Sequence, residues 1–392
     1  MAPQTQLRRQ SAVRGLFVRW GALAVAVAMQ AVLVLCARAA ETKHAWQLEW
    51  EQTIKAAEKE GQVVIYSTDG LDLVFREALQ KKFPKIKVTT VIGRGFELGQ
   101  RIMAERRAGK YIQDLFVMGS TTPVTVLYRG KALDAIRPAF ILPEVVDPST
   151  WWQGKHHYVD PESNYVFMFE GTARSGDITY NTSVVRPDEI KSYWDLVSPK
   201  WKGKIVALDP LIAGPASNSE RFFYYSPELG PEFVRKLFSD TDMTIVRNDE
   251  QLMDWLAVGK FAFGLFARAV DKAEKQGLPV RQFLPGQFKE GSSVGAYNGT
   301  LSFFNRAPNP NAAKVVINWL LSREGQNAWL EHNFKERSDY DSMREDIPKD
   351  KVNPRGRRVT GGKYLMTDRP EWMDMKPIYD VIKQASAEAR KQ

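Results

Sequence analysis

The sequence predicts an α/β fold with a mostly parallel sheet. Short apolar segments at 63–66, 86–92 and 114–118 are typical of buried strands. The first two are each followed by a polar loop and an amphipathic helix, expected at 71–83 and 96–108. Strands and helices that alternate in this way form βαβ units, and these units build parallel sheets. The chain has 392 residues, which is enough for two domains of this class.

The rest of the chain continues the same alternation. An amphipathic helix is expected at 46–60, where Gly61 ends it, and Pro84 stops the helix that begins at 71. Later strands are expected at 178–180, 205–208, 244–246, 261–266 and 301–304. Later helices are expected at 220–225, 233–238, 249–258 and 376–390. This second series of elements predicts a second α/β unit.

Three loops follow the first three predicted strands, at 67–70, 93–95 and 119–122. In open α/β sheets, ligands bind in the crevice at the carboxyl ends of the strands. We therefore expect a binding site where these loops meet.

The first 39 residues have the composition of a cleavable secretory signal. Residues 1–20 contain four arginines and no acid, and they precede an apolar run of about fifteen residues. That run is shorter than the roughly twenty residues that span a bilayer. Ala37–Arg38–Ala39 fits an A-x-A cleavage site. Arg8–Arg9 leaves twin-arginine export open, and Cys36 leaves lipidation open.

Removal of residues 1–39 would lower the formal net charge from +9 to +4, because five arginines and no acidic residues lie there. This mild charge does not favour nucleic-acid binding, which requires a concentrated basic face. The clusters Arg106–Arg107 and Arg355–Arg358 are interpreted as solvated surface. The single cysteine, Cys36, would also be removed, so the mature chain is not expected to use disulfides or thiolates.

Residues 307–326 predict a pair of helices. Pro308 and Pro310 keep the preceding chain extended, Asn311 is expected to cap the first helix, and Ser322 the second. The same stretch carries one of three motifs that occur in order: GQVVIYS, SPKWKGKI and NPNAAKVVINWLLSREGQ. Together they resemble segments of bacterial periplasmic solute-binding proteins, in the branch that includes the ferric-iron binders.

The resemblance covers about residues 62–330 and implies a Venus-flytrap fold. Two doubly wound α/β lobes would be joined by a two-strand hinge, near 177–181 and 299–304, and would enclose a ligand cleft. The implied division is signal peptide 1–39, lobe 1 from 40–176 plus 300–392, and lobe 2 from 177–299. Residues 331–392 fit the pattern poorly and are interpreted as a surface tail of lobe 1 with a packed end.

The same resemblance implies a function in transport. A periplasmic monomer would capture a small-molecule solute and deliver it to the permease of an ABC transporter in the inner membrane, without a cofactor.

The residues that hold iron in that branch are not found here. Its ferric binders use a tyrosine pair, a histidine and a carboxylate, which are hard ligands that suit Fe(III). The corresponding stretch 259–277 has no tyrosine, and Arg268 lies about where the pair would start. Tyr224–Tyr225 lie in a different predicted helix and are interpreted as part of an aromatic cluster. We expect no metal site of the known type; iron or another metal held by other ligands is the alternative.

The residues found instead favour an anion. Short hydroxyl residues at helix starts accompany backbone N–H groups that carry partial positive charge. Arginine forks suit carboxylate or phosphate. Asp69 would oppose an anion but suits an ammonium group, so a zwitterion is also considered. The predicted ligand-binding residues are Ser67, Thr68, Asp69, Arg94, Ser120, Thr121, Ser217, Asn218, Arg247, Arg268 and Asn298.

Catalysis has little support in the sequence. The histidines are His44, His156, His157 and His332, and neither H-E-x-x-H nor G-x-S-x-G occurs. Neighbouring residues on a strand point to opposite faces, so His156–His157 would make a poor pair of metal ligands and are interpreted as surface residues. The chain is not expected to be an enzyme; a secreted enzyme on a two-lobe α/β fold is the alternative from another class.

Overall fold

The computed structural model describes residues 43–68, 70–212, 216–268, 270–336 and 340–391. The expected signal peptide lies outside these ranges. Within them, no helix combines the length and the apolar composition that crossing a membrane requires. The chain divides into two units, Met1–Glu49 and Trp50–Gln392, and all the sheets belong to the second unit.

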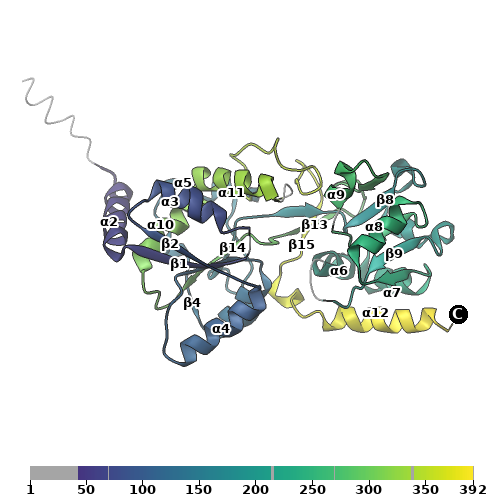
Figure 1. Ribbon diagram of the computed structural model, residues 1–392, viewed down its shortest axis with the longest axis horizontal. Coiled ribbons are helices and arrows are strands. Elements are labelled where there is room, and N and C mark those ends of the chain that lie inside the picture. Colours follow the sequence, from purple (N-terminus) through teal and green to yellow (C-terminus); the bar gives the residue numbers. More distant parts are fainter. Residues whose placement is uncertain (1–42, 69, 213–215, 269, 337–339, 392) are drawn as a thin grey trace, which may run out of the picture. The chain divides into compact units, whose positions relative to one another are not determined.

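The first sheet has seven strands in the order β2-β1-β3-β14-β6-β5, with β4 paired to β14 (Figure 1). Its parallel part is the expected one, formed by β1 (Gln62–Ser67), β2 (Lys87–Ile92) and β3 (Leu115–Met118). The other strands pair antiparallel, so the sheet is mixed: β4 (Leu133–Asp134), β5 (His157–Tyr158), β6 (Val166–Met168) and β14 (Thr300–Phe304). Because Thr300 pairs with Met118, the loop after β3 lies beside the chain that enters β14.

The helices of this part include those expected from the sequence and two, at 123–128 and 143–146, that were not predicted. They are α2 (Ala45–Glu60), η1 (Phe75–Leu79), α3 (Gln80–Lys82), α4 (Gly95–Arg107), η2 (Pro123–Tyr128), α5 (Pro143–Val146), α10 (Pro310–Leu321) and α11 (Arg323–Glu336). Short 3₁₀ turns along the chain are Arg137–Ala139, Pro148–Thr150, Trp152–Gly154, Pro187–Glu189, Tyr193–Val197, Pro199–Trp201 and Pro370–Trp372.

The second sheet has five strands in the order β10-β9-β11-β8-β12. In it, β9 (Ile205–Leu208) pairs parallel with β10 (Thr244–Val246) and β11 (Phe263–Leu265). The antiparallel neighbours are β8 (Ile178–Asn181) and β12 (Val280–Gln282). The helices between these strands are α6 (Ala216–Tyr225), α7 (Gly230–Ser239), α8 (Asp249–Ala257) and α9 (Val270–Lys275).

A third, small sheet connects the two large ones. We expected two strands at the crossover, and β7 (Thr172–Arg174) and β13 (Ser292–Gly295) pair antiparallel there. A third strand, β15 (Tyr364–Met366), pairs parallel with β13 and was not predicted. It comes from the segment that we interpreted as a surface tail. The expected crossover residues 178–181 and 300–304 lie inside the large sheets, as β8 and β14, so the chain crosses just before each of them.

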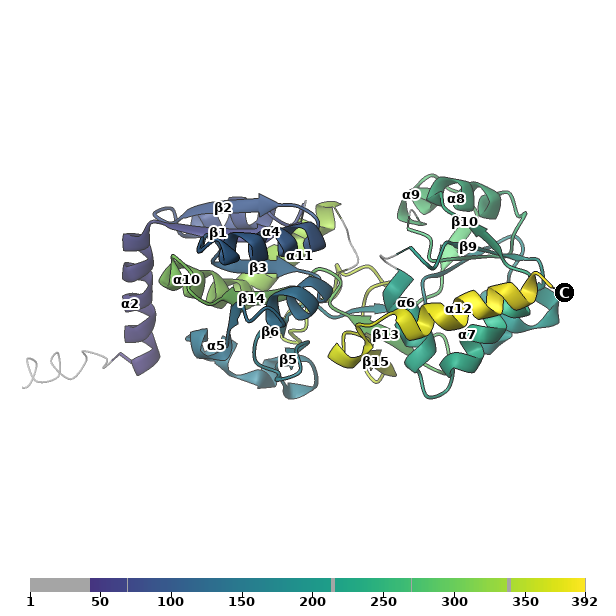
Figure 2. The same ribbon diagram turned by 90° about the horizontal axis from the view of Figure 1, so that it is seen from below.

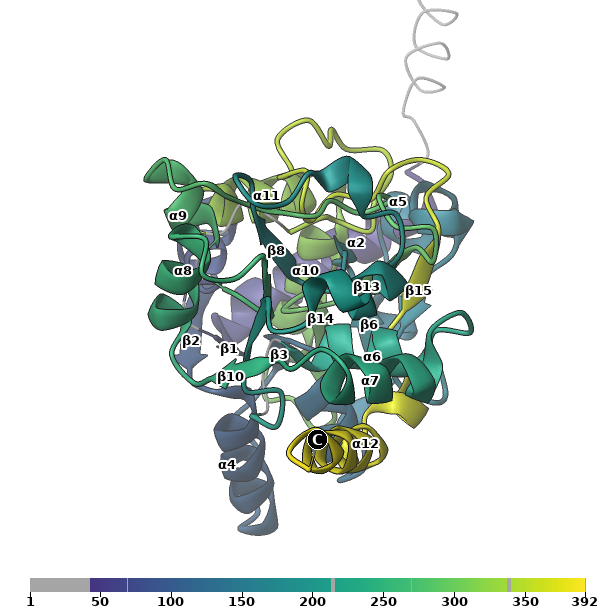
Figure 3. The same ribbon diagram turned by 90° about the vertical axis from the view of Figure 1, so that its right-hand side faces the viewer.

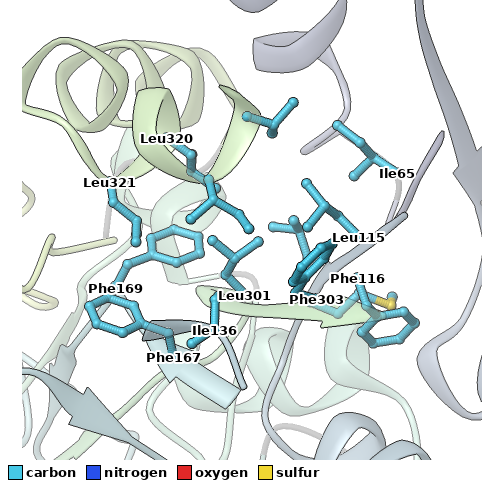
Figure 4. Packing of buried hydrophobic residues seen from close by; sticks show 14 of the residues in the cluster. Ile65, Leu115, Phe116, Ile136, Phe167, Phe169, Leu301, Phe303, Leu320 and Leu321 are labelled. Carbon is cyan, nitrogen blue, oxygen red and sulfur yellow. The ribbon is translucent and has the colours of Figure 1, made fainter. Parts of the chain in front are cut away.

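Two separate hydrophobic clusters hold the large sheets. The first surrounds β1, β3 and β14, where Ile65, Leu115 and Leu301 pack beneath Leu320 of α10 (Figure 4). The second surrounds β9 and β11. Two cores are consistent with two lobes, and the division at residues 177 and 299 stays a prediction.

The final helix, α12 (Lys376–Ala389), packs with the second cluster. Its Ile378, Ile382 and Ala385 are buried there, and it lies along α7 (Figures 2 and 3). The prediction of a helix was right, but the helix packs with the second cluster and not with the first, to which the predicted lobe 1 belongs. The helix has an apolar stripe at i, i+4 and i+7, which shows that it is buried but not against which partner.

The helix pair at 307–326 is built as expected except at its start. Asn309, not Asn311, is the N-cap residue of α10, and Asn311 Nδ2 instead donates to Glu60 Oε1 at 2.7 Å. Ser322 does cap the second helix, because its Oγ accepts a hydrogen bond from Gly325 N at 3.1 Å. A Cβ atom at Gly325 would overlap the carbonyl oxygen of Trp319. The glycine of this motif therefore allows α10 and α11 to meet.

Candidate functional site

A cavity of about 1170 Å³ opens where the loops of both large sheets and the C-terminal segment meet. Its walls come from elements far apart in the sequence, including β7, α6 and the residues just before β14. The lining residues that carry charge are Arg94, Arg174, Asp177, Arg221, Arg268, Asp271 and Arg355. Concave sites of this kind are the usual places where proteins bind small molecules.

Most of the residues predicted to bind ligand line this cavity. They are Thr68, Arg94, Ser120, Thr121, Ser217, Asn218, Arg268 and Asn298. Ser67 is not among the lining residues: it is fully buried and its Oγ donates to Val117 O at 3.0 Å. Arg247 is not among them either: its side chain is 83% exposed and its Nε lies 3.3 Å from Asp209 Oδ2. Asp69 lies outside the described residues. A binding role for the others stays a prediction.

The backbone around Gly119 explains how two of these segments come together. A Cβ atom at Gly119 would overlap the carbonyl oxygen of Tyr297, so only glycine allows the loop after β3 to approach the entry to β14 so closely. Thr121 then begins the helix that continues into η2. Pro123 in its first turn has no N–H, and Val124 N donates to Ser120 O, so the backbone N–H groups available to an anion at this helix start are those of Thr121 and Thr122.

Three of the predicted polar side chains already form hydrogen bonds with other residues of the protein. Ser120 Oγ donates to Asp368 Oδ1 at 2.5 Å, and Asn298 Nδ2 donates to the Tyr340 hydroxyl at 2.5 Å. Asn218 Oδ1 accepts a hydrogen bond from Arg221 Nη1 at 3.2 Å. These contacts fix the side chains before any ligand arrives, and pre-organisation of this kind reduces the cost of binding.

Three arginines of the cavity were not predicted. Arg174 ends β7, Arg221 lies in α6, and Arg355 lies in the C-terminal segment. Their side chains are 11%, 4% and 7% exposed. The interpretation of Arg355–Arg358 as solvated surface was therefore wrong for Arg355, and it was also wrong for Arg358, whose side chain is 5% exposed. An arginine in a sequence is interpreted as a surface residue unless another feature argues against it. Arg221 offered such a feature, because it directly precedes the aromatic helix end FFYY.

Each of these three arginines has one carboxylate nearby, and two of the three contacts are 3.6 Å or longer. Arg174 Nε lies 3.6 Å from Asp177 Oδ1, and Arg221 Nη1 lies 3.8 Å from Asp368 Oδ1. Arg355 forms an ion pair with Asp271. The Nε–H groups of Arg221 and of Arg355 are buried and have no hydrogen-bond partner among the described residues.

The electrostatic environment keeps the site positive at neutral pH. Burial, and then the charge of Arg174, lower the pKa of Arg355 to about 10, so the guanidinium stays protonated at pH 7. Burial raises the pKa of Tyr297, so its phenol stays neutral. The Arg174 guanidinium lies 5.0 Å from the centre of the Tyr297 ring, a cation–π contact. Among the described lining residues, five arginines face two aspartates.

The two tyrosines considered as iron ligands lie in a packing cluster, as predicted. Tyr225 stacks on Trp372 with ring centres 4.5 Å apart and an interplanar angle of 4°. Neither Tyr224 nor Tyr225 lines the cavity. Within the described ranges, no group of three histidine, cysteine, aspartate or glutamate side chains gathers in a way that could hold a metal ion.

The interpretation of His156–His157 as surface residues was wrong. His157 is 8% exposed, stacks on Trp152, and its Nε2 lies 2.8 Å from Trp152 O. Burial lowers the pKa of His157 to about 4, so it is neutral at physiological pH. His156 packs edge-on against Trp151 and Phe167. Both histidines are part of the core of the first sheet and lie outside the cavity wall.

The fold has two α/β lobes, and the candidate cavity is lined by residues from both of the large sheets' loops and helices. Residues 65–327 match the family of bacterial extracellular solute-binding proteins, and the chain belongs to that family. Members of this class capture a solute and serve ABC importers.

The chain is also similar to individual binding proteins. Iron uptake protein A1 of Synechocystis is 23% identical over 260 residues, which cover 64% of this chain and 68% of that protein. The Trichodesmium protein solved with iron and citrate is 21% identical, covering 84% of this chain and 99% of that chain, with a TM-score of 0.59. The protein AfuA of Actinobacillus pleuropneumoniae, solved with fructose-6-phosphate, is 19% identical, covering 85% and 99%, with a TM-score of 0.54. At these identities the structural likeness establishes the fold.

Proposed function

We propose that this solute-binding protein captures a small anionic solute in the cavity and delivers it to the permease of an ABC importer. The observation that carries the proposal is the charge of the cavity wall, in which five arginines face two aspartates among the described residues. Guanidinium groups form paired hydrogen bonds with carboxylate or phosphate oxygens. An anion would also restore the hydrogen bonds that buried arginine N–H groups lack.

The same wall favours an anion over a zwitterion. An ammonium group needs an unpaired carboxylate, but Asp177 lies beside Arg174 and accepts a hydrogen bond from Ser219 Oγ at 2.7 Å. Asp271, the other described aspartate of the wall, forms an ion pair with Arg355. Asp69, the residue for which we considered an ammonium partner, lies outside the described ranges.

Capture, not chemistry, is the proposed mechanism. A ligand that contacts residues of both lobes stabilises the closed arrangement of the protein. In the open arrangement the lobes are further apart and some of these contacts are missing. Thr68 and Ser120, in loops that follow strands of the first sheet, and Asn218, in α6, line the cavity and would contribute such contacts. Export to the periplasm and a monomeric state remain part of the proposal, as the sequence predicts.

A ferric ion held by other oxygen ligands is the second candidate. It is favoured by the Trichodesmium protein, whose bound species include both iron and citrate, and by three tyrosines on the cavity wall here, Tyr297, Tyr340 and Tyr379. Citrate is itself a polycarboxylate. A site for the anion and a site for iron chelated by the anion can therefore be distinguished only by testing the anion and Fe(III) separately.

A thermal-shift screen of residues 40–392 tests the proposal. The panel is phosphate esters, phosphonates, carboxylates, polyamines, Fe(III) alone and Fe(III) with citrate. A solute that binds only the folded protein raises its Tm, and the stabilisation grows with the logarithm of one plus the ratio of solute concentration to Kd. We expect phosphate or carboxylate anions to raise Tm and polyamines to have no effect. Stabilisation by Fe(III) alone, with no anion effective, would overturn the proposal in favour of the metal.

A further inference from the structure

The C-terminal segment, residues 340–379, is an ordered wall of the cavity and not a surface tail. It follows residues 337–339, which lie outside the described ranges, and it lies beyond residues 65–327, the part of the chain that matches the family. Its lining residues are Tyr340, Arg355, Met373, Met375 and Tyr379. The segment therefore contributes side chains to the site that the family pattern does not describe.

Backbone hydrogen bonds hold this segment in place along its length. Ala173 N, in β7, donates to Gly356 O at 2.8 Å, which fixes the residue next to Arg355. Thr367 N donates to Val294 O at 3.0 Å, and Ala296 N donates to Asp368 Oδ2 at 2.5 Å. Arg355 is therefore held next to the sheet that connects the two lobes, and the residue as a whole is 6% exposed.

Arg355 and Arg221 each have hydrogen-bonding capacity that the described residues do not use. A guanidinium has five N–H donors, and leaving one of them buried without a partner costs free energy. The Nε–H groups of both residues are buried and unpartnered, and both residues line the cavity. Arg221 is 3% exposed. Two nearly buried cations with unused donors on one cavity wall indicate that a ligand supplies the missing acceptors.

The third cation of this wall limits the class of that ligand. Arg174 lies close enough to Arg355 for its charge to lower the pKa of Arg355, and Asp177 and Asp271 offset the two charges in part. A doubly charged anion would interact with both guanidinium groups at once. A monocarboxylate offers one negative charge and two oxygens, which one arginine fork can fully occupy. A phosphate group offers three terminal oxygens and a charge of about −1.5 to −2 at pH 7.

Resting on the proposed function, we propose that Arg355 of the C-terminal segment, with Arg174 and Arg221, binds a doubly charged oxyanion of the phosphate type, and that this end of the cavity selects such solutes over monocarboxylates. The remaining volume of the cavity, with Met373, Met375 and Tyr379 on its wall, would hold the rest of an organic phosphate or phosphonate.

The test is calorimetric titration of residues 40–392 with inorganic phosphate and with acetate at matched ionic strength. The variants are R355Q, R355K and the control K351Q, which removes the same charge from an exposed position of the same segment. We expect phosphate to bind wild type at least tenfold more tightly than acetate. Loss of a charged hydrogen bond in R355Q is expected to weaken phosphate binding about ten- to a hundredfold, whereas K351Q should bind like wild type.

The outcomes separate this inference from the proposal on which it rests. Equal affinity for phosphate and acetate would overturn the proposed class of ligand. An R355Q protein that keeps its phosphate affinity would overturn the proposed role of Arg355. In both cases an anion still binds, so the proposed function stands. Absence of any anion binding would overturn both. If R355Q does not fold, R355K decides the matter, because it keeps the charge but loses the fork and should weaken phosphate more than acetate.

Discussion

Ser120 and Asp368 are 248 positions apart in the sequence, and Ser120 Oγ donates a hydrogen bond to Asp368 Oδ1 at 2.5 Å. The contact joins the loop after β3 to the C-terminal segment. Asp368 also accepts from Ala296 N at 2.5 Å and lies 3.8 Å from Arg221. One buried carboxylate thus holds three parts of the cavity wall together.

Replacement of that carboxylate should destabilise the protein. In D368N the side chain loses its charge, and Arg221 is left buried without its nearby anion. Breaking a buried pair in this way costs roughly 3 kcal/mol. Urea unfolding followed by tryptophan fluorescence measures the loss. The matched control is D350N in the same segment, at an exposed position, which should change the free energy of unfolding by less than about 0.5 kcal/mol. Equal effects of the two substitutions would contradict this role of Asp368.

The exposed arginines at the cavity should contribute less than the buried ones but still measurably. Arg94 and Arg268 line the cavity, and the Arg94 side chain is 89% exposed. R94A and R268A should each lower the Tm shift produced by the best anion of the screen, with a loss of affinity of about two- to tenfold. R247A is the control, because Arg247 was predicted to bind ligand but lies beside Asp209, off the cavity wall. A shift reduced by R247A alone would show that the cavity is not the site.

Glu220 should make the protein less stable as the pH rises. It is 2% exposed, neither carboxyl oxygen has a hydrogen-bond partner among the described residues, and burial raises its pKa to about 8. Below pH 4.5 both the folded and unfolded states hold the proton. Between pH 4.5 and 8 the unfolded chain releases it first, so the free energy of unfolding falls by up to roughly 4 kcal/mol.

The variant E220Q has no proton to lose, so the gap between it and wild type should grow in its favour from pH 4.5 to 8. Unfolding curves at several pH values measure this gap. The exposed E371Q is the control, since Glu371 should contribute no such trend. A gap independent of pH would contradict the burial of Glu220 as its cause.

The motif that identifies the family should matter for stability and not for binding. In G325A the new Cβ would overlap the carbonyl of Trp319, and the adjoining backbone of α10 leaves little room to relax. Overpacking of this kind costs about 1–3 kcal/mol. The Tm should fall, while the affinity for the best anion, measured at a temperature where the variant is folded, should stay unchanged. A marked loss of affinity would place this helix pair in the site.

Most of the regular elements could be predicted from the sequence, and the reason is local. Strands such as β1 and helices such as α4 carry their own apolar period, and Gly61 and Pro84 mark ends that depend on backbone geometry alone. The segment around β15 has no such period. Its position depends on pairing with β13, about seventy residues earlier, and the sequence of the segment does not indicate that pairing partner.

The candidate site could be predicted only in part for a similar reason. Loops at the carboxyl ends of strands indicated Thr68, Ser120 and Thr121 correctly as wall residues. Arg174 and Arg355 gave no comparable signal, because an arginine is buried only when distant parts of the chain fold over it. Arg247 shows the opposite error: it follows a strand end, but its side chain turns to Asp209.

The cavity is proposed to bind an anion and not a free metal ion. Calorimetric titration of residues 40–392, first freed of bound solute by unfolding and refolding, with inorganic phosphate and separately with Fe(III) tests it most directly. We expect saturable binding of phosphate, which should weaken in R355Q. We expect no heat of binding from Fe(III) alone. Tight binding of Fe(III) without any anion, unaffected by R355Q, would contradict it.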